Sequence, residues 1–596
     1  MMRIPGSALL RVTACLLAIS SLGALSAGAA DAPAGAVAPV ASTAATDKPD
    51  NDTCLACHGN AGFSAPGAGG KERPLHVAQD KFGASSHGKL ECVSCHTAIT
   101  DVPHKNIPAE GSPARAAQRK GIPELCGTCH AKQRDEYATS VHGREALEKG
   151  NPAAAVCSDC HKPHAVQDPT GDVARLTITK SCGSCHKDML RTYTETYHGQ
   201  INALGYANTA KCFDCHGSHG IQRVGDPASS VHRKNRLETC QKCHINASEG
   251  FATFAPHGDA RDFARYPMIW LAQKMMVGLL VGTFAFFWLH TAMWFYREYK
   301  ERSERKSRPQ VLASALPTGT TGKHFQRFSA TWRVAHLSFA LSLMVLTLTG
   351  MPVFYPESSW APAVMKLLGG PQTAAIIHRV AAVVFAGVFF WHLGYVALRL
   401  ARNWKNFRIF GSDSLIPGLQ DLKDIIAMFT WFIGKGTRPI FDRWTYWEKF
   451  DYWAPFWGVT IIGVSGLMMW LPNLTASFLP GWVFNIAAIF HGEEAFLAVV
   501  FLFTVHFFNN HFRPDKFPLD IVMFTGTMTL EAFRHEHGVQ YQRLLDSGEL
   551  EKHLVDAPSQ PMTLGAKILG TVLIIVGLTL LVFVLAGFLQ GFSGGH

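Results

Sequence analysis

The pattern Cys-x-x-Cys-His occurs seven times between residues 54 and 244, and it constrains this chain more than any other feature. Two thiols at this spacing form thioether bonds with a haem, and the following His binds the iron. Zinc knuckles or disulfides would leave some pairs without the trailing His, whereas the motifs use 14 of the 15 cysteines and leave only Cys15. We therefore predict seven c-type haems, with thioether bonds at Cys54, Cys57, Cys92, Cys95, Cys126, Cys129, Cys157, Cys160, Cys182, Cys185, Cys212, Cys215, Cys240 and Cys243, and proximal iron ligands at His58, His96, His130, His161, His186, His216 and His244.

Residues 54–265, which contain these motifs, are polar and hold few long apolar periods. By composition alone, such a segment could remain disordered. Seven porphyrins change that expectation, because each supplies apolar surface that the sequence lacks. The first cysteines of successive motifs lie 38, 34, 31, 25, 30 and 28 residues apart, which is an irregular repeat. We predict short helices and loops around a row of closely spaced haems, with little strand.

Nine further histidines lie in residues 54–265, outside the motifs. Most of them follow an attachment His closely or precede a Gly, and His76 fits these patterns least. Two imidazoles on one iron leave no open position, so such haems transfer electrons rather than bind small substrates. His164 follows His161 across a short Pro-containing turn, so we expect it to bind a neighbouring haem. The eight candidates for the seven distal positions are His87, His104, His142, His164, His198, His219, His232 and His257.

The N-terminus has the features of an export signal. Residues 1–30 begin with Arg3 and Arg11, continue through the apolar run LLAISSLGALSAG and end in small residues, which predicts a secretory signal peptide. Residues 31–53 are rich in Ala, Pro, Asp and Thr and predict a flexible linker. Export agrees with the haem motifs, because covalent haem attachment takes place outside the cytoplasm.

After residue 265 the composition changes, and six apolar segments follow at 268–296, 332–352, 374–399, 453–471, 484–508 and 562–590. Each is long enough, or nearly so, to cross a bilayer of about 30 Å as a helix. The fold class that we predict is mainly α, with an irregular multihaem c-type domain of short helices and a six-helix transmembrane bundle of the cytochrome b type. Membrane lipid is therefore an expected partner.

The basic loops predict how the chain is oriented. REYKERSERKSR (297–308) follows the first span, and Arg399, Arg402, Lys405 and Arg408 follow the third. Basic loops stay in the cytoplasm, so we predict a multi-pass protein of the bacterial inner membrane with its haem c domain and C-terminus in the periplasm. The net charge of +10 largely reflects this bias, and we predict no nucleic-acid partner. The predicted parts after the linker are a periplasmic heptahaem domain (54–265), the first transmembrane helix with a basic cytoplasmic segment (266–310), a dihaem membrane domain (325–515), a cytoplasmic segment (516–561) and the last transmembrane helix (562–590).

Several histidines lie inside the apolar segments, where ionisable residues are costly and mark functional sites. His378 and His392 are fourteen residues apart in the third span, and His491 and His506 are fifteen apart in the fifth. At 1.5 Å per residue this is about 21 Å, so each helix offers a His near each membrane face. We predict two b-type haems. One lies between His378 and His491, and the other takes His506 with either His336 or His392. His290, at the end of the first span, competes for the same place.

Three stretches, WRVAHLSFALSLMVLTLTG, IIHRVAAVVF and FHGEEAFLAVVFLFTVHFF, resemble the dihaem b-type membrane subunit of respiratory formate dehydrogenases and nickel hydrogenases, over residues 325–515. The resemblance implies that His336, His378, His491 and His506 bind the two haems and that His392 is left over. The spacing from His491 to His506 is one residue longer than in that family. Together with the haem motifs, WEKFDYWAPFWG (447–458) and HFRPDKFPLDIVMFTG (511–526) resemble inner-membrane fusions of a multihaem cytochrome c with a quinone-linked cytochrome b, which occur in metal-respiring bacteria.

The second resemblance implies a quinol:cytochrome c-type oxidoreductase, which takes electrons from a quinol and gives them to c-type haem. Electrons would pass from the quinone pool, with menaquinol as donor, through two b haems and seven c haems to a periplasmic c-type cytochrome or terminal reductase. Glu493 and Glu494, beside His491, are candidate proton acceptors, although acidic residues are also favoured for structural reasons in the first turn of a helix. The quinone site could instead lie at the other end of this span, near Asn509, Asn510 and His511.

Three other functions are compatible with the sequence. Electrons could flow in reverse, from a periplasmic donor to quinone. The haem domain could be a terminal reductase of a nitrogen or sulfur oxyanion, which requires a haem with an open iron position. The chain could also be an electron wire bound to a separate dehydrogenase. The segment 409–446 predicts an interfacial helix or a docking surface, and His-Glu-His at 535–537 predicts a solvated cytoplasmic turn rather than a metal site.

Overall fold

The computed structural model describes residues 48–66, 72–104, 108, 112–306 and 322–593. The predicted signal peptide, Cys15 and residues 31–47 of the predicted linker lie outside these ranges. The described part of the chain is mainly α, which confirms the predicted fold class, and its strands are three or four residues long. Two compact units divide the chain, residues 1–130 with 162–167 and residues 131–161 with 168–596, so the division falls inside the segment that holds the haem motifs.

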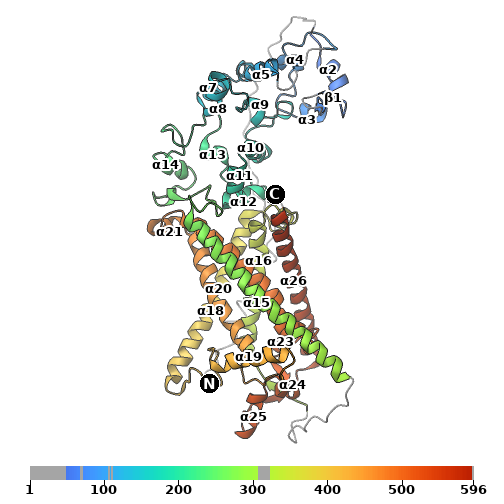
Figure 1. Cartoon of the computed structure of the whole chain (residues 1–596), viewed down its shortest axis with the longest axis vertical. Helices are drawn as coiled ribbons and strands as arrows, with labels where there is room; N and C mark the ends of the chain where they lie inside the picture. Colours follow the sequence, from blue (N-terminus) through green and yellow to red (C-terminus); the bar gives the residue numbers. More distant parts are fainter. Residues whose placement is uncertain (1–47, 67–71, 105–107, 109–111, 307–321, 594–596) are drawn as a thin grey trace. The chain divides into compact units, whose positions relative to one another are not determined.

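In the first unit, short helices alternate with loops. The carboxylate of Asp50 accepts the backbone N–H of Thr53 at 2.8 Å and so caps the first described helix. A two-stranded antiparallel ribbon pairs Ser64 with Pro74. The elements of this unit are α2 (Asn51–His58), β1 (Ser64–Pro66), β2 (Glu72–Pro74), α3 (Gln79–Gly83), α4 (Cys92–Cys95), α5 (Pro113–Lys120), α6 (Ile122–Gly127) and the 3-10 helix η4 (Pro163–Ala165) (Figure 1).

The second unit begins with more short helices that carry the remaining haem motifs. Two buried tyrosines hold this part together, because the hydroxyl of Tyr137 donates to Ala155 O at 2.9 Å and that of Tyr193 donates to Ala210 O at 2.8 Å. The elements are α7 (Ala131–Thr139), α8 (Val141–Gly143), the π-helical η3 (Arg144–Glu148), α9 (Cys157–Cys160), α10 (Asp172–Cys185), α11 (Lys187–Thr194), α12 (Tyr197–Ala203), α13 (Cys212–His216), α14 (Arg236–Gln241) and the 3-10 helix η5 (Phe251–Thr253).

Six helices of the described chain are long and apolar enough to cross a membrane, which confirms the six predicted spans. α16 packs against α18, α20 packs against α22, and α15 runs obliquely against α22 (Figure 1). The buried core centres on α22 and includes Val499 and Phe503, against which Val584 of α26 packs. The elements are α15 (Pro267–Lys306), α16 (Ala330–Phe354), α17 (Ala361–Leu367), α18 (Pro371–Asn403), the 3-10 helix η6 (Trp404–Asn406), α20 (Tyr446–Trp470), α21 (Pro472–Phe478), α22 (Val483–Phe501) with the π-helical η7 (Leu502–His506) and η8 (Phe508–Phe512), and α26 (Gln560–Ser593).

A small cap forms between the spans at the end opposite to α17 and α21. Its three-stranded antiparallel sheet has the order β4-β3-β5, and the ring of Phe325 stacks on that of Phe533 with centroids 3.7 Å apart. His537 is 2% exposed, and its Nδ1 lies 2.9 Å from Asp442 O, so the prediction of a solvated turn at 535–537 is wrong for His537, whereas His535 is exposed. The cap contains β3 (Lys323–Gln326), α23 (Val522–Thr525), β4 (Thr527–Thr529), α24 (Leu530–Glu536), α25 (Gly538–Asp546), the 3-10 helix η9 (Leu550–His553) and β5 (Leu554–Asp556).

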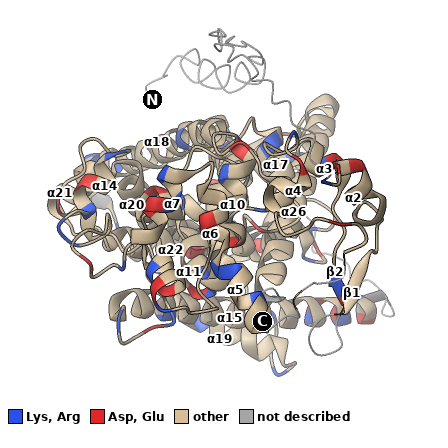
Figure 2. Cartoon of the chain, turned by 90° about the horizontal axis from the view of Figure 1, so that it is seen from above, with Lys and Arg blue, Asp and Glu red and all other residues tan. Residues whose placement is uncertain are grey.

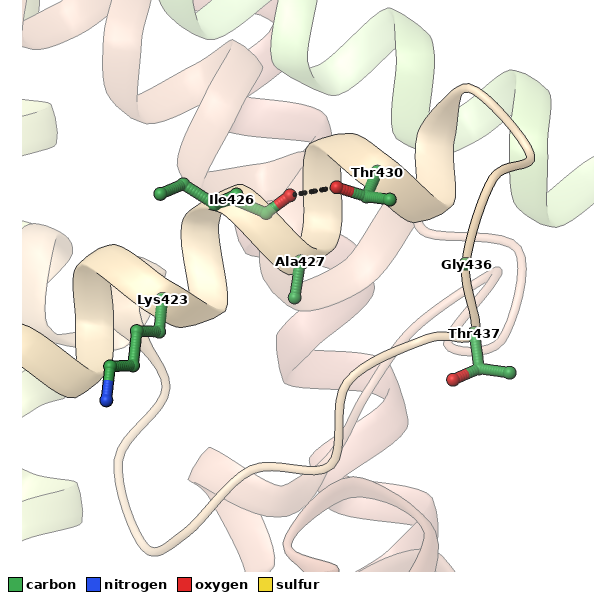
Figure 3. Close-up of a pocket in the computed structure, with 6 residues that line it drawn as sticks. All are labelled: Lys423, Ile426, Ala427, Thr430, Gly436 and Thr437. Carbon is green, nitrogen blue, oxygen red and sulfur yellow. Dashed lines mark hydrogen bonds between the residues drawn. The ribbon is translucent and has the colours of Figure 1, made fainter.

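The predicted interfacial segment contains one amphipathic helix, α19 (Leu419–Phe432). Its buried face, with Trp431, packs toward α15, whereas Leu422 and Ile426 on the other face are more than half exposed. A pocket of about 360 Å³ opens beside it and is lined by apolar and polar side chains: Lys423, Ile426, Ala427, Thr430, Gly436 and Thr437 (Figure 3). Along the ribbon, Lys and Arg positions and Asp and Glu positions are interspersed among uncharged residues in the view of Figure 2.

Candidate haem-binding sites

Each Cys-x-x-Cys-His motif folds as one helical turn. In the second motif, for example, the backbone N–H of His96 donates to Cys92 O at 2.9 Å, and the same i to i−4 bond joins His161 to Cys157 and His244 to Cys240. A helical turn brings residues i and i+4 to the same side of the backbone. The motif therefore presents its first Cys and its His together, as attachment of one haem requires.

Every attachment histidine faces a second histidine ring. The centroids of the two rings lie 5.9 to 6.3 Å apart in all seven cases. Each pair lies within one compact unit. The pairs are His58 with His104, His96 with His164, His130 with His87, His161 with His219, His186 with His142, His216 with His257 and His244 with His198.

This spacing can be compared with what two axial ligands need. A metal–nitrogen bond of about 2 Å on each side, plus the distance from each nitrogen to its ring centre, places two imidazole centroids about 6 Å apart across one iron. Direct contact between stacked rings would bring them closer. The ring pairs therefore fit a haem iron between them.

The pairing follows a two-haem repeat that the sequence analysis missed. Three of the four histidines before a Gly, His87, His142 and His198, face the attachment His of the second motif that follows them, whereas His257 follows the last motif and faces His216. A His after an even-numbered motif faces the attachment His of an earlier motif, as His164 faces His96. The repeat is visible in the sequence as Tyr or Phe, two residues, Ser or Thr, one residue and His-Gly in FGASSHG, YATSVHG and YTETYHG. This pattern could have separated the candidates that face the His of a later motif from those that face the His of an earlier motif.

The Gly of this repeat is required by close backbone packing. A Cβ on Gly143 would lie 1.9 Å from Tyr137 O, and one on Gly199 would lie 2.1 Å from Tyr193 O. Directly before these positions, the Ser140 hydroxyl accepts the N–H of Gly143 at 2.9 Å. The His between the hydroxyl residue and the Gly is thereby held on a capped, tightly packed turn.

The other two histidines lie outside these pairs. His232, the eighth candidate, accepts the backbone N–H of Lys234 through Nδ1 at 3.3 Å. His76 lies in the loop that follows β2. Neither faces an attachment histidine within the described residues.

Two more ring pairs lie between the membrane-spanning helices. The first joins His378 of α18 to His491 of α22, with centroids 6.2 Å apart. Nδ1 of His378 lies 2.8 Å from Thr349 Oγ1, and Nδ1 of His491 lies 3.0 Å from Ile462 O. With Nδ1 occupied on both rings, Nε2 is the nitrogen that remains for a ligand.

The residues that surround His378 and those that surround His491 are arranged in the same way. Gly350, which follows Thr349 on α16, is so close to His378 that a Cβ would lie 3.2 Å from its Cε1. On α20, Ser465 lies 3.3 Å from Nδ1 of His491, and a Cβ on the following Gly466 would lie 3.0 Å from Cε1 of that ring. The helix pairs α16–α18 and α20–α22 thus present a hydroxyl residue and a Gly to a His in the same way.

The second pair joins His336 of α16 to His506 at the end of η7, with centroids 6.4 Å apart. Nδ1 of His506 lies 3.1 Å from a carboxylate oxygen of Asp451 and 3.2 Å from Nδ2 of Asn510. The π-helical turn of η7 takes up one extra residue between His491 and His506. It therefore accounts for the fifteen-residue spacing while both rings face the same side of α22.

The competing histidines have tyrosine partners instead. Nε2 of His392 lies 2.9 Å from the hydroxyl of Tyr452, and Nε2 of His290 lies 2.5 Å from that of Tyr446. The duplication explains the first of these contacts, because Tyr452 precedes Gly466 by the fourteen residues that separate His336 from Gly350. A Tyr therefore stands where the first helix pair has a His.

The predicted proton acceptors lie one turn beyond His491. Glu493 accepts the side-chain N–H of Gln273 at 3.1 Å. Glu494 is 3% exposed, and its Oε2 has no hydrogen-bond partner among the described residues. Near the second ring pair, Asn509 Oδ1 and His511 Nδ1 are buried and also lack a partner there.

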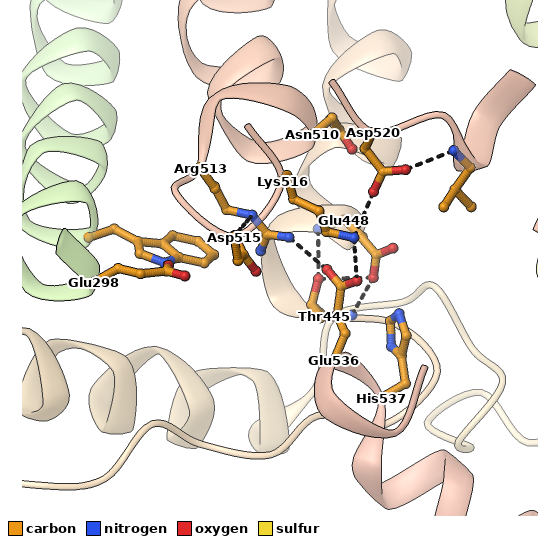
Figure 4. A network of polar contacts seen from close by, with 12 residues as sticks. Glu298, Thr445, Glu448, Asn510, Arg513, Asp515, Lys516, Asp520, Glu536 and His537 are labelled. Carbon is orange, nitrogen blue, oxygen red and sulfur yellow. Dashed lines mark hydrogen bonds and ion pairs between the residues drawn. The ribbon is translucent and has the colours of Figure 1, made fainter. Parts of the chain in front are cut away.

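A buried network of charges fixes the end of η8 to the cap (Figure 4). Arg513 donates to Glu536 at 2.7 Å, and Lys516 donates to the same carboxylate at 2.9 Å and to Asp520 at 2.6 Å. Burial by itself would raise the pKa of Glu536, but the charges of Arg513 and Lys516 hold it well below its ordinary value. Arg513 follows His506 by seven residues, so the network holds the segment that carries this ring.

Comparison with known proteins gives one set of matches. The chain is similar to the formate dehydrogenase, cytochrome b556(fdo) subunit, of Escherichia coli K12, O6:H1 and O157:H7, each 23% identical over 185 residues, which is 30% of this chain and 76% of the relative. No family profile and no solved structure matches the chain. The similarity and the six apolar helices fit a cytochrome b-type part that spans the membrane.

Proposed function

We propose that this protein is a quinol-oxidising membrane cytochrome, which passes electrons from menaquinol through two b-type haems to seven periplasmic c-type haems and on to a periplasmic acceptor. The observation that carries the proposal is the set of nine histidine ring pairs with centroids 5.9 to 6.4 Å apart. Seven of them include a His of an attachment motif, and two lie between apolar helices. The relatives' name, cytochrome b556, supports b-type haem in the second group.

In this proposal the paired histidines are the axial ligands. A haem bound between two imidazoles takes up and releases one electron and has no open position for a substrate. This favours electron transfer over a terminal reductase among the alternatives. The seven distal ligands are His87, His104, His142, His164, His198, His219 and His257, and the b-type ligands are His336, His378, His491 and His506.

The neighbours of the b-type ligands orient the rings. Thr349 and Ile462 O occupy Nδ1 of His378 and His491, and Asp451 occupies Nδ1 of His506. A carboxylate on the far nitrogen of a histidine ligand makes the ligating nitrogen a stronger base. The Asp451 contact would therefore favour the oxidised iron and lower the potential of the haem at His506.

Quinol oxidation releases two protons with its two electrons, so the site needs proton acceptors. Glu494 fits this role because its buried Oε2 lacks a partner, and Glu493 lies beside it with a bond to Gln273. Both follow His491 on α22. We place proton uptake here, and Asn509 with His511 near the second ring pair is the other position with unpartnered polar atoms.

The experiment is stopped-flow absorbance of the oxidised, detergent-solubilised protein mixed with menaquinol, with the b and c α bands followed separately. The proposal expects reduction of b haems followed by c haems. Reduction by dithionite but not by quinol would contradict it and point to a missing dehydrogenase partner. Oxidation of prereduced haems by menaquinone, without the forward reaction, would instead show flow from a periplasmic donor to quinone.

A further inference from the structure

The segment around η5 is docked on the membrane-spanning helices by backbone contacts. Gly481 donates its backbone N–H to Gly250 O at 2.8 Å and to Thr253 Oγ1 at 2.7 Å. A Cβ on Gly250 would lie 2.5 Å from Ala476 O, and one on Gly481 would lie 2.5 Å from Phe254 N. The two backbones therefore touch where any side chain would force them apart.

Side chains complete this attachment at the start of α22. Asn485 donates to Ala255 O at 2.8 Å and accepts the N–H of the same residue at 3.3 Å. On the other side of η5, the hydroxyl of Ser248 donates to Ala476 O at 3.1 Å. The residues that flank η5 are thus fixed to the helix that carries His491 and to the short helix before it.

An aromatic contact runs through the docked segment. The ring of His244, an attachment histidine, lies 4.8 Å from that of Phe251, and Phe251 lies 6.0 Å from Phe484. Phe484 is in the first turn of α22, seven residues before His491. Two turns of helix cover about 10 Å, so His491 is close to the end of this contact.

The partner of His244 is docked by a second, independent contact. His198 lies on α12, and Ile201 of that helix is buried against residues of α17 and α18. Tyr206, just beyond α12, accepts a side-chain N–H of Gln372. Both histidines of this pair therefore come from segments that are held against the membrane-spanning helices. The apolar cluster at this contact is Ile201, Leu204, Ala361, Met365 and Ala374.

We propose that the c-type haem held by His198 and His244 is the first to exchange electrons with the membrane part, and that Phe251 and Phe484 are the packed contact through which the electrons pass. Packed atoms between two redox centres are a better medium for electron tunnelling than a gap. The inference rests on the proposed function, because quinol supplies the electrons.

The step is a single electron transfer. With haems bound, one electron would leave the site held by His378 and His491, which would be oxidised, and enter the site held by His198 and His244, which would be reduced. No bond forms or breaks, and no proton moves. The competing entry point is the haem between His216 and His257, because a Cβ on the neighbouring Gly258 would lie 3.0 Å from Asn485 Nδ2.

The first test replaces both rings of the contact in the full-length holoprotein, Phe251→Leu with Phe484→Leu. We expect unchanged b-band reduction by menaquinol and several-fold slower transfer from b to c haems. The matched control is Phe63→Leu, because Phe63 lies 5.2 Å from the attachment histidine His58 in the other compact unit. Haem content and dithionite-reduced spectra show that each variant is intact, and an unchanged b-to-c rate in the double variant would overturn the proposal.

The second test compares His198→Met with His257→Met. His198→Met should alter one low-spin electron paramagnetic resonance signal and remove the first, fast phase of c-band reduction, in which electrons arrive from the b haems. His257→Met should alter a different signal and leave that phase unchanged. The reverse result would place the entry at the sixth motif and overturn the proposal.

The two proposals fail separately. If menaquinol reduces no b haem in the unsubstituted protein, the quinol-oxidising function fails. Electrons injected by a photoexcited ruthenium complex still redistribute between the b and c bands, and the rate in the Phe251→Leu, Phe484→Leu variant then tests the contact alone. A slower redistribution supports the contact, and an unchanged one contradicts it.

Discussion

Histidine rings come to face each other by different means in the two parts of this molecule. In the motif-bearing segment, a Cys-x-x-Cys-His motif marks one member of each pair, and in three pairs a repeated turn such as Ser140 to Gly143 carries the other. In the membrane part no covalent motif marks a ligand, and six histidines compete for four positions. Hydrogen bonds from neighbouring helices separate them there, because His378 and His491 have Nδ1 occupied, whereas Nε2 of His392 is occupied by Tyr452.

Under the proposed function, this difference implies that haem retention would depend on the ligands in the membrane part and on thioether bonds in the motif-bearing segment. This difference in haem retention gives a test of the proposals, because substitution of an iron ligand should remove a b-type haem but only modify a c-type haem.

The largest effect is expected for His491→Ala. Without a covalent bond, the b-type haem between His378 and His491 should be lost, so the ratio of b to c haem in a pyridine haemochrome assay should fall by half. His392→Ala is the matched control on α18, the helix that carries His378, and it should leave the ratio unchanged. A protein that keeps both b haems after His491→Ala would contradict the assignment.

The next effect concerns the buried network behind His506. Glu536→Gln leaves Arg513 and Lys516 without their shared carboxylate, and breaking a buried ion pair costs on the order of 3 kcal/mol. The thermal midpoint of the b-band loss should therefore fall at pH 7. Glu549→Gln, which removes an exposed pair with Lys552, should leave the midpoint unchanged.

The pH dependence of this effect has a defined sign. Because the pKa of Glu536 in the folded protein lies well below its ordinary 4.5, its contribution to stability is fully present above pH 4.5 and is lost as the pH falls toward the lowered pKa. The stability difference between the native protein and Glu536→Gln should therefore shrink below pH 4.5. A difference that stays constant through this range would contradict the network.

The contrast between locally marked residues and residues selected by tertiary contacts also decides how much of the molecule could be predicted from sequence. The seven motifs and the six apolar runs carry their own signals, because attachment chemistry and membrane burial restrict residue types locally. The choice of His336 or His392, and of seven ligands among eight candidates, depends on which helices and turns become neighbours. Cap residues such as His537 look solvated in sequence, because it is tertiary contacts such as that with Asp442 O that bury them.

Gly143→Ala tests the repeated turn in the motif-bearing segment. Because a Cβ there would lie 1.9 Å from Tyr137 O, the backbone must shift, and overpacking of this kind costs up to about 3 kcal/mol. We expect the haem to stay attached through its thioether bonds while the electron paramagnetic resonance signal of one low-spin c haem broadens or is lost. Gly121→Ala, where the nearest atom would be 3.5 Å away, is the control and should have no such effect.

The smallest effect separates the eighth candidate from the seven ring pairs. His219 faces His161 with centroids 6.3 Å apart, whereas His232 accepts a backbone N–H and faces no other histidine ring within the described part of the chain. His219→Met should keep all seven c haems, because the thioether bonds remain, but it should raise the reduction potential of one of them, since a thioether ligand favours ferrous iron more than imidazole does. His232→Met should leave every potential in a spectroelectrochemical titration unchanged. A shift in the His232 variant without one in the His219 variant would mean that the turn around residue 219 delivers no ligand and that distal ligands in this segment are not chosen by the repeat.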